Sequence, residues 1–293
     1  MTGAEIELQL KQYMVKLINK EVSIPEDIAT KFSKSILKTF TREERTGFTL
    51  SPSMLGKPLC QIQMADADAP RELIMEDSTA AKFATGHMLE AWLVAVMEAA
   101  GIPIEALAIP TTLEVYGQTI KGEADIIIDG KVYDVKSCSA YAYKKFGPEG
   151  GFGAVAEDDP FGYVVQGFLY AAALGLPFGG WIVANKNTGE VSVCEVPEFQ
   201  DHHSEAALMY AESVVKAIVD GEEFKRCFEP EDEIFYKKPT GNKVLCFSCS
   251  WCSYRNTCWD NLDYRPNVMS NAMSPKWKYY THIENIPEKK EKK

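Results

Sequence analysis

The first forty residues repeat apolar side chains at helical spacing. One such segment covers residues 4–20, and a second begins at Pro25, a residue that suits the first turn of a helix. Spacings of three and four residues place side chains on one face of a helix. The pattern therefore predicts an N-terminal pair of helices whose apolar faces are formed by Ile6, Leu10, Tyr13, Met14 and Leu17 in the first and Ile28, Phe32, Ile36 and Phe40 in the second.

Helix and strand patterns alternate through the middle of the chain. A long helix is predicted at 79–100 and ends at Gly101, and strands follow at about 111–117, 119–128 and 131–138. A helix from Pro160 to about residue 174, a hairpin over 179–196 and a helix at 199–220 complete the pattern. This order predicts one α/β domain with a mixed central sheet flanked by helices.

The stretch "GEADIIIDGKVYDVKSCS", residues 122–139, is typical of two strands joined by a tight Asp-Gly turn. Continuing the register outward from this turn places Asp125 directly opposite Asp134, with Lys136 on the same face. Two like charges at this separation destabilise a sheet. A divalent cation with oxygen ligands, Mg²⁺ or Mn²⁺, would account for the pattern. The plainer alternative is an exposed polar face of the hairpin.

Length and charge narrow the function classes. The 293 residues suffice for one large domain or two small ones. No run of about 18 apolar residues occurs, and the N-terminus lacks a signal pattern, so we expect a cytoplasmic protein with no membrane partner. The net charge of −11 argues against a surface that coats nucleic acid. DNA contacts would then come from local patches such as Lys144–Lys145, residues 31–45 or Lys237–Lys238.

Four of the eight cysteines fall within thirteen residues, in the order Cys246, Cys249, Cys252 and Cys258. In a cytosolic chain such a cluster indicates a metal site before it indicates disulfides. These four thiols could bind one zinc ion locally. The remaining cysteines are scattered, at Cys60, Cys138, Cys194 and Cys227, and we expect the last three to be plain core or surface thiols.

Several of these motifs together resemble the PD-(D/E)XK nuclease superfamily. The matching motifs are "TGHMLEAW" with His87, "GEAD" with Asp125, "DVK" with Asp134 and Lys136, and "QGFLY" downstream. The chain is most similar to the RecB-like branch, which includes CRISPR-associated and phage recombination exonucleases. The resemblance covers about residues 80–260 and implies a restriction-endonuclease-like core. Asp134 stands where many members carry glutamate, and either acid can bind a metal ion.

The resemblance also implies roles for individual residues. The metal ligands would be Asp125, Asp134, the carbonyl of Val135 and His87, and the imidazole suits Mn²⁺ better than Mg²⁺. Lys136 would orient or deprotonate water or stabilise the phosphate. The implied contacts to the substrate or to this lysine come from Gln166 and Tyr170, which share one helix face. Glu90, one turn beyond His87, could support the metal site. Each assignment has a plainer alternative. His87 could be an ordinary core histidine and Glu90 a surface glutamate, while Tyr170 could serve helix packing and Gln166 face solvent.

Many RecB-like nucleases hold a 4Fe–4S cluster with one cysteine before the nuclease core and three after it. The implied ligands here are Cys60, Cys249, Cys252 and Cys258. The rival interpretation is the local zinc site, in which Cys246 replaces Cys60.

From these motifs we predict a metal-dependent DNA exonuclease that acts in recombination, repair, phage replication or CRISPR adaptation. Residues 1–45 would be a helical hairpin, 46–262 the nuclease domain with the cysteines, and 263–293 a partly disordered tail. DNA is the expected partner, recombination or CRISPR adaptation proteins are further candidates, and an oligomer is left open. The cell would be bacterial, archaeal or phage-infected. The alternative from another class is a non-catalytic nucleic-acid-binding or assembly module with a zinc or iron–sulfur site.

Overall fold

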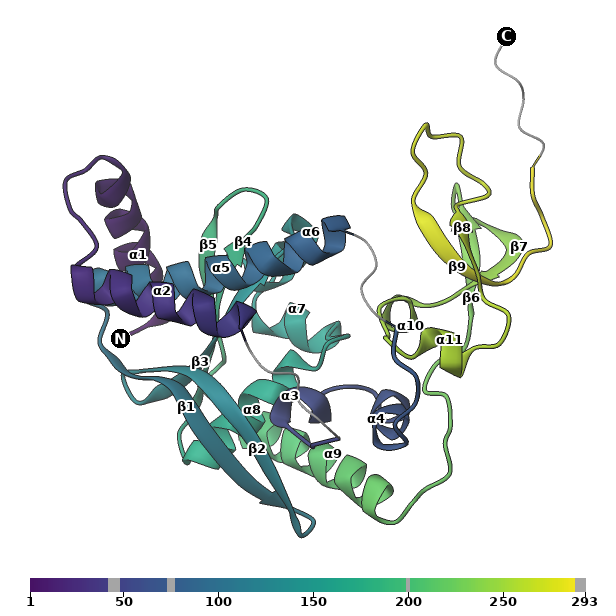
Figure 1. Cartoon of the computed structure of the whole chain (residues 1–293), viewed down its shortest axis with the longest axis horizontal. Coiled ribbons are helices and arrows are strands. Elements are labelled where there is room, and N and C mark those ends of the chain that lie inside the picture. Colours follow the sequence, from purple (N-terminus) through teal and green to yellow (C-terminus); the bar gives the residue numbers. More distant parts are fainter. Residues whose placement is uncertain (42–47, 73–76, 199–200, 288–293) are drawn as a thin grey trace. The chain divides into compact units, whose positions relative to one another are not determined.

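The computed structural model describes residues 1–41, 48–72, 77–198 and 201–287, and the chain divides into two units (Figure 1). The larger unit comprises Met1–Gly56 and Ile74–Asp220, and the smaller comprises Lys57–Leu73 and Gly221–Lys293. The boundary predicted near residue 45 lies outside the described residues. The cysteine segment groups with residues 57–73 and the C-terminal strands, a division that differs from the predicted domain limits.

A five-stranded sheet forms the centre of the larger unit, in the order β1-β2-β3-β4-β5. Only β3 and β4 run parallel; the other neighbours are antiparallel. The strands are β1 (Ile104–Val115), β2 (Gln118–Ile128), β3 (Lys131–Cys138), β4 (Phe178–Asn185) and β5 (Val191–Glu195). The predicted α/β class with a mixed central sheet flanked by helices is therefore confirmed.

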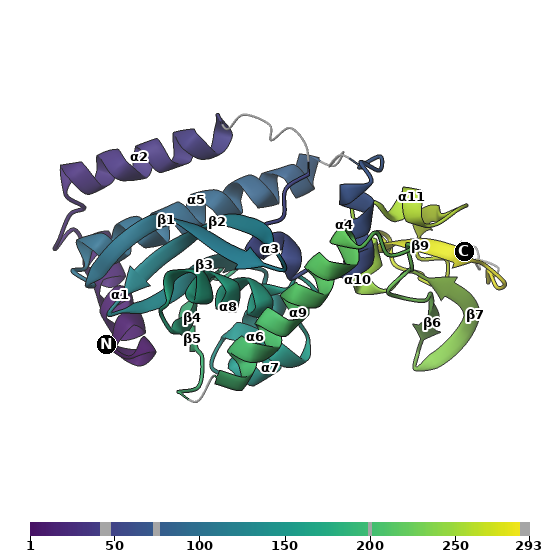
Figure 2. The ribbon, with the colours of Figure 1, turned by 90° about the horizontal axis from the view of Figure 1, so that it is seen from below.

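Helices cover both faces of this sheet, as Figure 2 shows. On one face, α1 (Gly3–Ile18) and α5 (Asp77–Ala99) bury Ile6, Leu10 and Leu93 against side chains of β2–β5, and α2 (Glu26–Phe40) packs on α5. The other face is covered by α6 (Ala140–Phe146), α7 (Phe152–Glu157) and α8 (Tyr163–Leu174), and α9 (Asp201–Val219) packs on α8. A short helix, α3 (Pro52–Leu55), packs against α8. The predicted N-terminal helix pair is confirmed.

The hairpin register predicted from the Asp-Gly turn is confirmed for the pairs nearest the turn, which end at Ile126 with Tyr133. The face assignment is confirmed as well, because Tyr133 and Val135 pack in the core on the α1–α5 side. The expectation that Asp125 and Asp134 form a ladder pair is wrong, since the pairing of β2 with β3 stops before them. Beyond that point β3 continues its pairing with β4 alone.

The smaller unit contains a four-stranded antiparallel sheet in the order β6-β7-β9-β8. Its strands are β6 (Glu231–Phe235), β7 (Lys238–Val244), β8 (Asp263–Pro266) and β9 (Trp277–His282), and its helices are α4 (Leu59–Asp66), α10 (Phe247–Ser250) and α11 (Arg255–Cys258). Two of these strands lie in the segment predicted as a tail. Buried Glu233 joins the strands, because it accepts hydrogen bonds from Asn242, Lys278 and Tyr280.

Within the described residues, no helix combines the length and the apolar character needed to cross a membrane.

Candidate functional site

The larger unit places its acidic residues where β2 and β3 separate. Asp125 lies on β2 next to the last paired residue, and its Oδ2 accepts a hydrogen bond of 2.8 Å from the backbone N–H of Val135 on β3. Extension of the register would bring that N–H to Ala124 across the ladder. The Asp125 side chain thus replaces a backbone acceptor where the two strands part, which fixes its carboxylate beside β3.

Asp134, on β3, is the most deeply buried acid of the site, with 3% of its surface exposed. Its Oδ1 accepts hydrogen bonds from Lys136 Nζ at 2.8 Å and from Gln166 Nε2 on α8 at 3.4 Å. Its Oδ2 is buried and has no hydrogen-bond partner among the described residues. A buried carboxylate oxygen without a partner is costly, so this atom marks a place for a ligand.

Burial and repulsion from neighbouring acids raise the pKa values of Asp125 and Asp134. Burial and the nearby Asp134 raise the pKa of Asp125 to about 7. Burial also raises the pKa of Asp134, against the opposing attraction of Lys136. For Lys136, burial lowers the pKa, but attraction to Asp134 and Asp125 outweighs it and the net pKa is raised. The site therefore holds one firmly protonated lysine beside two carboxyls that resist joint ionisation.

The candidate residues on α5 form an outer layer. Glu90 Oε1 accepts hydrogen bonds from the N–H of Ser137 at 3.0 Å and from its hydroxyl at 2.9 Å, so Glu90 ties α5 to the end of β3. Nδ1 of His87 lies 3.5 Å from Glu90 Oε2, and the imidazole is 55% exposed. The structure therefore connects His87 to the site through Glu90.

The helix α8 presents Gln166 and Tyr170 toward the site. Both are buried, and a Cβ at Gly122 would lie 2.7 Å from Tyr170 Cε1, so the tyrosine packs closely over β2. Burial, with Asp134 and Asp125 nearby, raises the pKa of Tyr170 to about 12, which keeps its phenol neutral. The expectation that both residues point from one helix face is consistent with these contacts.

Two further residues belong to the site and were not identified from sequence. Lys136 Nζ lies over the ring of Tyr163, 5.3 Å from its centroid, a cation–π contact that helps to place the ammonium. Helical spacing could have found it, because Tyr163 precedes Gln166 by three residues. Lys186 follows β4, and its Nζ would lie 3.5 Å from a Cβ at Gly86. Gly86 thereby lets α5 approach the ends of β3 and β4, and no sequence signal indicated this lysine.

Asp125 and Asp134 supply some, but not all, of the oxygen ligands that a divalent cation such as Mg²⁺ needs. Two carboxylates share one region, their charges repel each other, and one oxygen lacks a partner. A cation between them would relieve each of these costs. Among the described residues, however, no three His, Cys, Asp or Glu side chains are already grouped as metal ligands, so His87 does not join the pair. The two carboxylates are the ligands that the geometry brings together, and the Val135 carbonyl remains a ligand that the resemblance implies.

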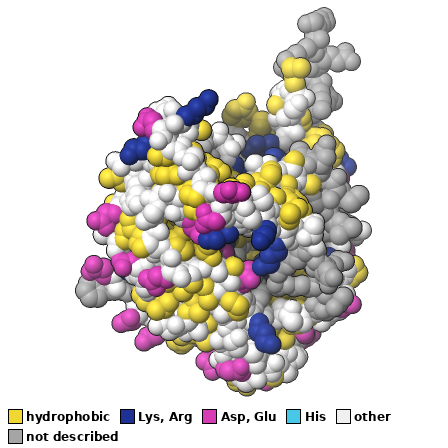
Figure 3. Space-filling model, turned by 60° about the vertical axis from the view of Figure 1, so that its left-hand side comes forward, with side chains coloured by type: hydrophobic (Ala, Val, Ile, Leu, Met, Phe, Trp, Pro, Cys, Tyr) yellow, Lys and Arg dark blue, Asp and Glu magenta, His cyan; other side chains and the backbone are white. Residues whose placement is uncertain are grey.

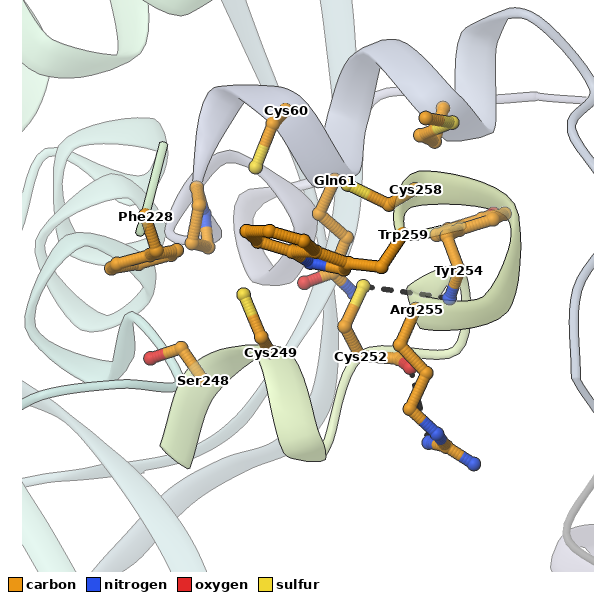
Figure 4. A pocket seen from close by; sticks show the side chains of 12 residues that line it. Cys60, Gln61, Phe228, Ser248, Cys249, Cys252, Tyr254, Arg255, Cys258 and Trp259 are labelled. Atoms are coloured by element: carbon orange, nitrogen blue, oxygen red, sulfur yellow. Dashed lines mark hydrogen bonds between the residues drawn. The ribbon is translucent and has the colours of Figure 1, made fainter. Parts of the chain in front are cut away.

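The smaller unit gathers cysteines around a cavity of about 20 Å³, drawn in Figure 4. Cys60 from α4 and Cys249, Cys252 and Cys258 from the segment after β7 all line it. Cys246 does not line the cavity; it is buried, and its Sγ accepts a hydrogen bond of 3.5 Å from the N–H of Cys249. These four lining residues are the set that the resemblance implied for an iron–sulfur cluster, but among the described residues no three cysteines are already grouped as metal ligands.

The cavity is small, since about 20 Å³ suffices for roughly one water molecule. The indole of Trp259 also lines it, and the guanidinium of Arg226 lies 4.5 Å from the centre of that ring. A bound cluster would require this wall to open. Burial and the nearby Cys227 raise the pKa of Cys60 to about 12, so its thiol is protonated until a metal displaces the proton.

Cys227, expected to be a plain thiol, is a neighbour of this site. Its Sγ accepts a hydrogen bond of 3.2 Å from the N–H of Cys60. Cys138 and Cys194, by contrast, are buried in the core of the larger unit, as expected for plain core thiols.

No protein-family model and no curated protein sequence matches the chain. Among solved structures, the chain is similar to SSO0001, with a TM-score of 0.41 and 12% identity over 78% of this chain and 95% of the other. It is also similar to a protein from Eubacterium rectale named "Putative exonuclease", with a TM-score of 0.35 and 17% identity over 66% of this chain and 76% of the other. At these values neither likeness assigns a function to the chain.

Proposed function

We propose that the larger unit is a metal-dependent nuclease that hydrolyses phosphodiester bonds in DNA, with exonuclease action in DNA end processing. The observation that carries this proposal is Asp134, whose buried Oδ2 has no hydrogen-bond partner in the part of the chain that the structure describes, while Oδ1 accepts from Lys136. A solvated polar face of a hairpin would leave both oxygens in water. The burial instead isolates an acid pair and a lysine beneath α8, which is an arrangement suited to chemistry on a charged substrate.

Asp125, Asp134 and the Val135 carbonyl would hold Mg²⁺ or Mn²⁺. Such an ion supplies an activated water molecule and offsets charge on the phosphate. Lys136 remains protonated in the site, so its role would be to stabilise the phosphate oxygens and to orient water rather than to accept a proton. Tyr163 and Gln166 position Lys136 and Asp134, respectively.

Three other residues take supporting roles in this proposal. Tyr170, neutral and packed over β2, would contact the substrate beside Gln166. His87 would approach the metal only if its side chain left Glu90, so we assign it a role at the rim without direct coordination of the metal. Glu90 would hold the end of β3 in place.

For the smaller unit we propose a 4Fe–4S cluster held by Cys60, Cys249, Cys252 and Cys258. Their common cavity supports this set, and the position of Cys246 outside the lining favours it over the local zinc site. Four thiolates are the usual ligands of such clusters. The cluster would tie residues 57–73 to the segment after β7 and thus stabilise the unit.

The charge distribution favours DNA contacts in a few places over a general basic surface. The net charge of −11 arises in the larger unit, whereas the smaller unit carries nearly equal numbers of basic and acidic residues. On the face drawn in Figure 3, acidic side chains are scattered and basic side chains gather in only a few places. A nuclease of this kind would bind DNA through its metal ion, Lys136 and Lys186.

Cleavage of end-labelled single- and double-stranded DNA tests the proposal. The purified chain should cleave with Mn²⁺ or Mg²⁺ and should not cleave with chelator. Asp134→Ala should reduce the rate at least 100-fold, because it removes the atom that carries the proposal. Glu123→Gln, which changes an exposed acid on the neighbouring strand β2, is the matched control and should retain full activity. Cleavage by Asp134→Ala at the normal rate, or none by the unaltered chain, would leave the non-catalytic module as the better function.

A further inference from the structure

The outer face of the β8–β9 hairpin in the smaller unit carries a row of aromatic side chains. Tyr264 and Tyr279 are directly opposed in the ladder, and Trp277 lies two residues before Tyr279 on the same face. The rings of Tyr264 and Tyr279 stack with centroids 4.3 Å apart, and Tyr264 lies 4.9 Å from Trp277. The guanidinium of Arg255 lies over Tyr279 at 4.4 Å.

The opposite face of the same hairpin is the one that serves the fold. Tyr280 is buried there, and both Tyr280 and Lys278 donate to the buried carboxylate of Glu233. The aromatic row therefore faces outward, and it is open at one end: Trp277 is 55% exposed and Tyr264 is 42% exposed. A cross-strand pair of tyrosines would stabilise the hairpin by itself. An exposed indole beside that pair adds little to the fold, because much of its surface stays in water.

Two cations lie close to this aromatic row. Lys276 is exposed next to Trp277, and Arg255 lies over Tyr279, where its counter-ion is Glu72. Arg265, paired with Lys278 in the ladder, belongs to the opposite face. The larger unit, in contrast, carries the net negative charge of the chain. Flat rings with adjacent cations form the kind of surface that holds unpaired nucleic acid, in which bases stack on aromatic side chains.

We propose that this hairpin face, formed by Tyr264, Trp277 and Tyr279 with Arg255 of α11 over Tyr279, binds single-stranded DNA. An unpaired base stacks on the exposed ring of Trp277 and extends the row, while the neighbouring Lys276 contacts a backbone phosphate. Duplex DNA binds less well, because its bases are already stacked and paired. This inference rests on the proposed nuclease function for the choice of DNA, and it assigns the smaller unit a substrate-binding role separate from its cysteines.

Fluorescence anisotropy with a short labelled oligo(dT) tests the proposal on the full chain. The measurement is made in chelator, so binding is read without cleavage. Trp277→Val, which suits a strand but removes the ring, should weaken binding roughly 10-fold, whereas Trp277→Phe should weaken it by no more than about 3-fold. An abasic strand of the same length should bind the unaltered chain as weakly as oligo(dT) binds Trp277→Val.

Trp251→Val is the matched control, since Trp251 is also 55% exposed in the same unit but belongs to a different segment. It should bind oligo(dT) within about 2-fold of the unaltered chain. Equal weakening by both Val variants, unchanged binding by Trp277→Val, or no binding of oligo(dT) by the unaltered chain would overturn the proposal. If Trp277→Val does not fold, Tyr264→Leu replaces it. This variant should also bind oligo(dT) more weakly than the unaltered chain does, and the abasic strand should again bind the unaltered chain weakly. Because cleavage is assayed separately with Mn²⁺, a failure of the nuclease proposal would be seen independently.

Discussion

Replacement of Asp125 by asparagine should stabilise the metal-free protein while it removes metal binding. The environment raises the pKa of Asp125 from 3.8 to about 7, chiefly through burial and repulsion from Asp134. An acid with a raised native pKa binds its proton more tightly when folded than when unfolded. The metal-free free energy of unfolding should therefore fall as pH rises from about 4 to about 7.

The magnitude follows from the size of this shift. About three pKa units correspond to about 4 kcal/mol of native-state cost once Asp125 is ionised. Asparagine mimics the protonated acid, and its carbonyl can still accept the Val135 N–H that Asp125 binds. Local relaxation and water lower the real cost, so we expect Asp125→Asn to gain about 2 kcal/mol at pH 8 and almost nothing at pH 4.

Chemical unfolding at pH 4, 6 and 8, followed by circular dichroism in chelator, measures this difference. Addition of Mn²⁺ at pH 8 should then stabilise the unaltered chain and leave Asp125→Asn unchanged, because a cation favours the ionised pair. Glu123→Gln, on the same strand but half exposed, should behave like the unaltered chain in both conditions. An Asp125→Asn variant that is less stable than the unaltered chain at pH 8 in chelator would refute the reasoning.

Three other predictions concern single elements of the structure. Gly162→Ala should cost about 3 kcal/mol in thermal unfolding, because its Cβ would lie 2.0 Å from the Gly56 carbonyl oxygen at a positive φ; Gly175→Ala, at a positive φ but in open space, should cost about 1 kcal/mol. Tyr163→Ala should lower the cleavage rate about 10-fold and Tyr163→Phe should leave it nearly unchanged, since only the ring contacts Lys136. Anaerobically purified protein should absorb visible light through an iron–sulfur cluster, and Cys60→Ser should abolish the colour, while Cys246→Ser, at a thiol outside the cavity, should retain it.

Local patterns predicted the parts of the fold that depend on neighbours in sequence. The Asp-Gly turn predicted the register of β2 and β3 near the turn, and alternation predicted that Tyr133 and Val135 share a face, which packs against α1 and α5. The first strand was predicted to begin at about residue 111, whereas β1 begins at Ile104. In the structure Pro110 lies within β1, and β1 is an edge strand, where the missing N–H has no ladder partner to lose.

The sheet of the smaller unit could not be predicted in this way. Its strands β7 and β9 pair across more than thirty intervening residues, and β8 and β9 are short. Short strands without a turn signal between them have no periodicity that separates them from loops. Glu233 is buried and accepts hydrogen bonds from residues on two other strands. From the sequence alone, a glutamate at this position would be expected on the surface.

Asp125 and Asp134 show that pairing between strands, which local patterns predict poorly, also determines the geometry of the candidate site. Residue types identified Asp125, Asp134 and Lys136, but continuous pairing of the hairpin was the wrong reason for their proximity. β3 pairs with β4 along its other edge, and β4 follows in the chain only after three helices. The parting of β2 from β3 leaves the Val135 N–H for Asp125, and Asp134 Oδ2 is buried there without a hydrogen-bond partner among the described residues. A complete ladder between β2 and β3 would have used this N–H in the sheet, so the arrangement of the acids depends on where the pairing of these strands ends as much as on the acids themselves.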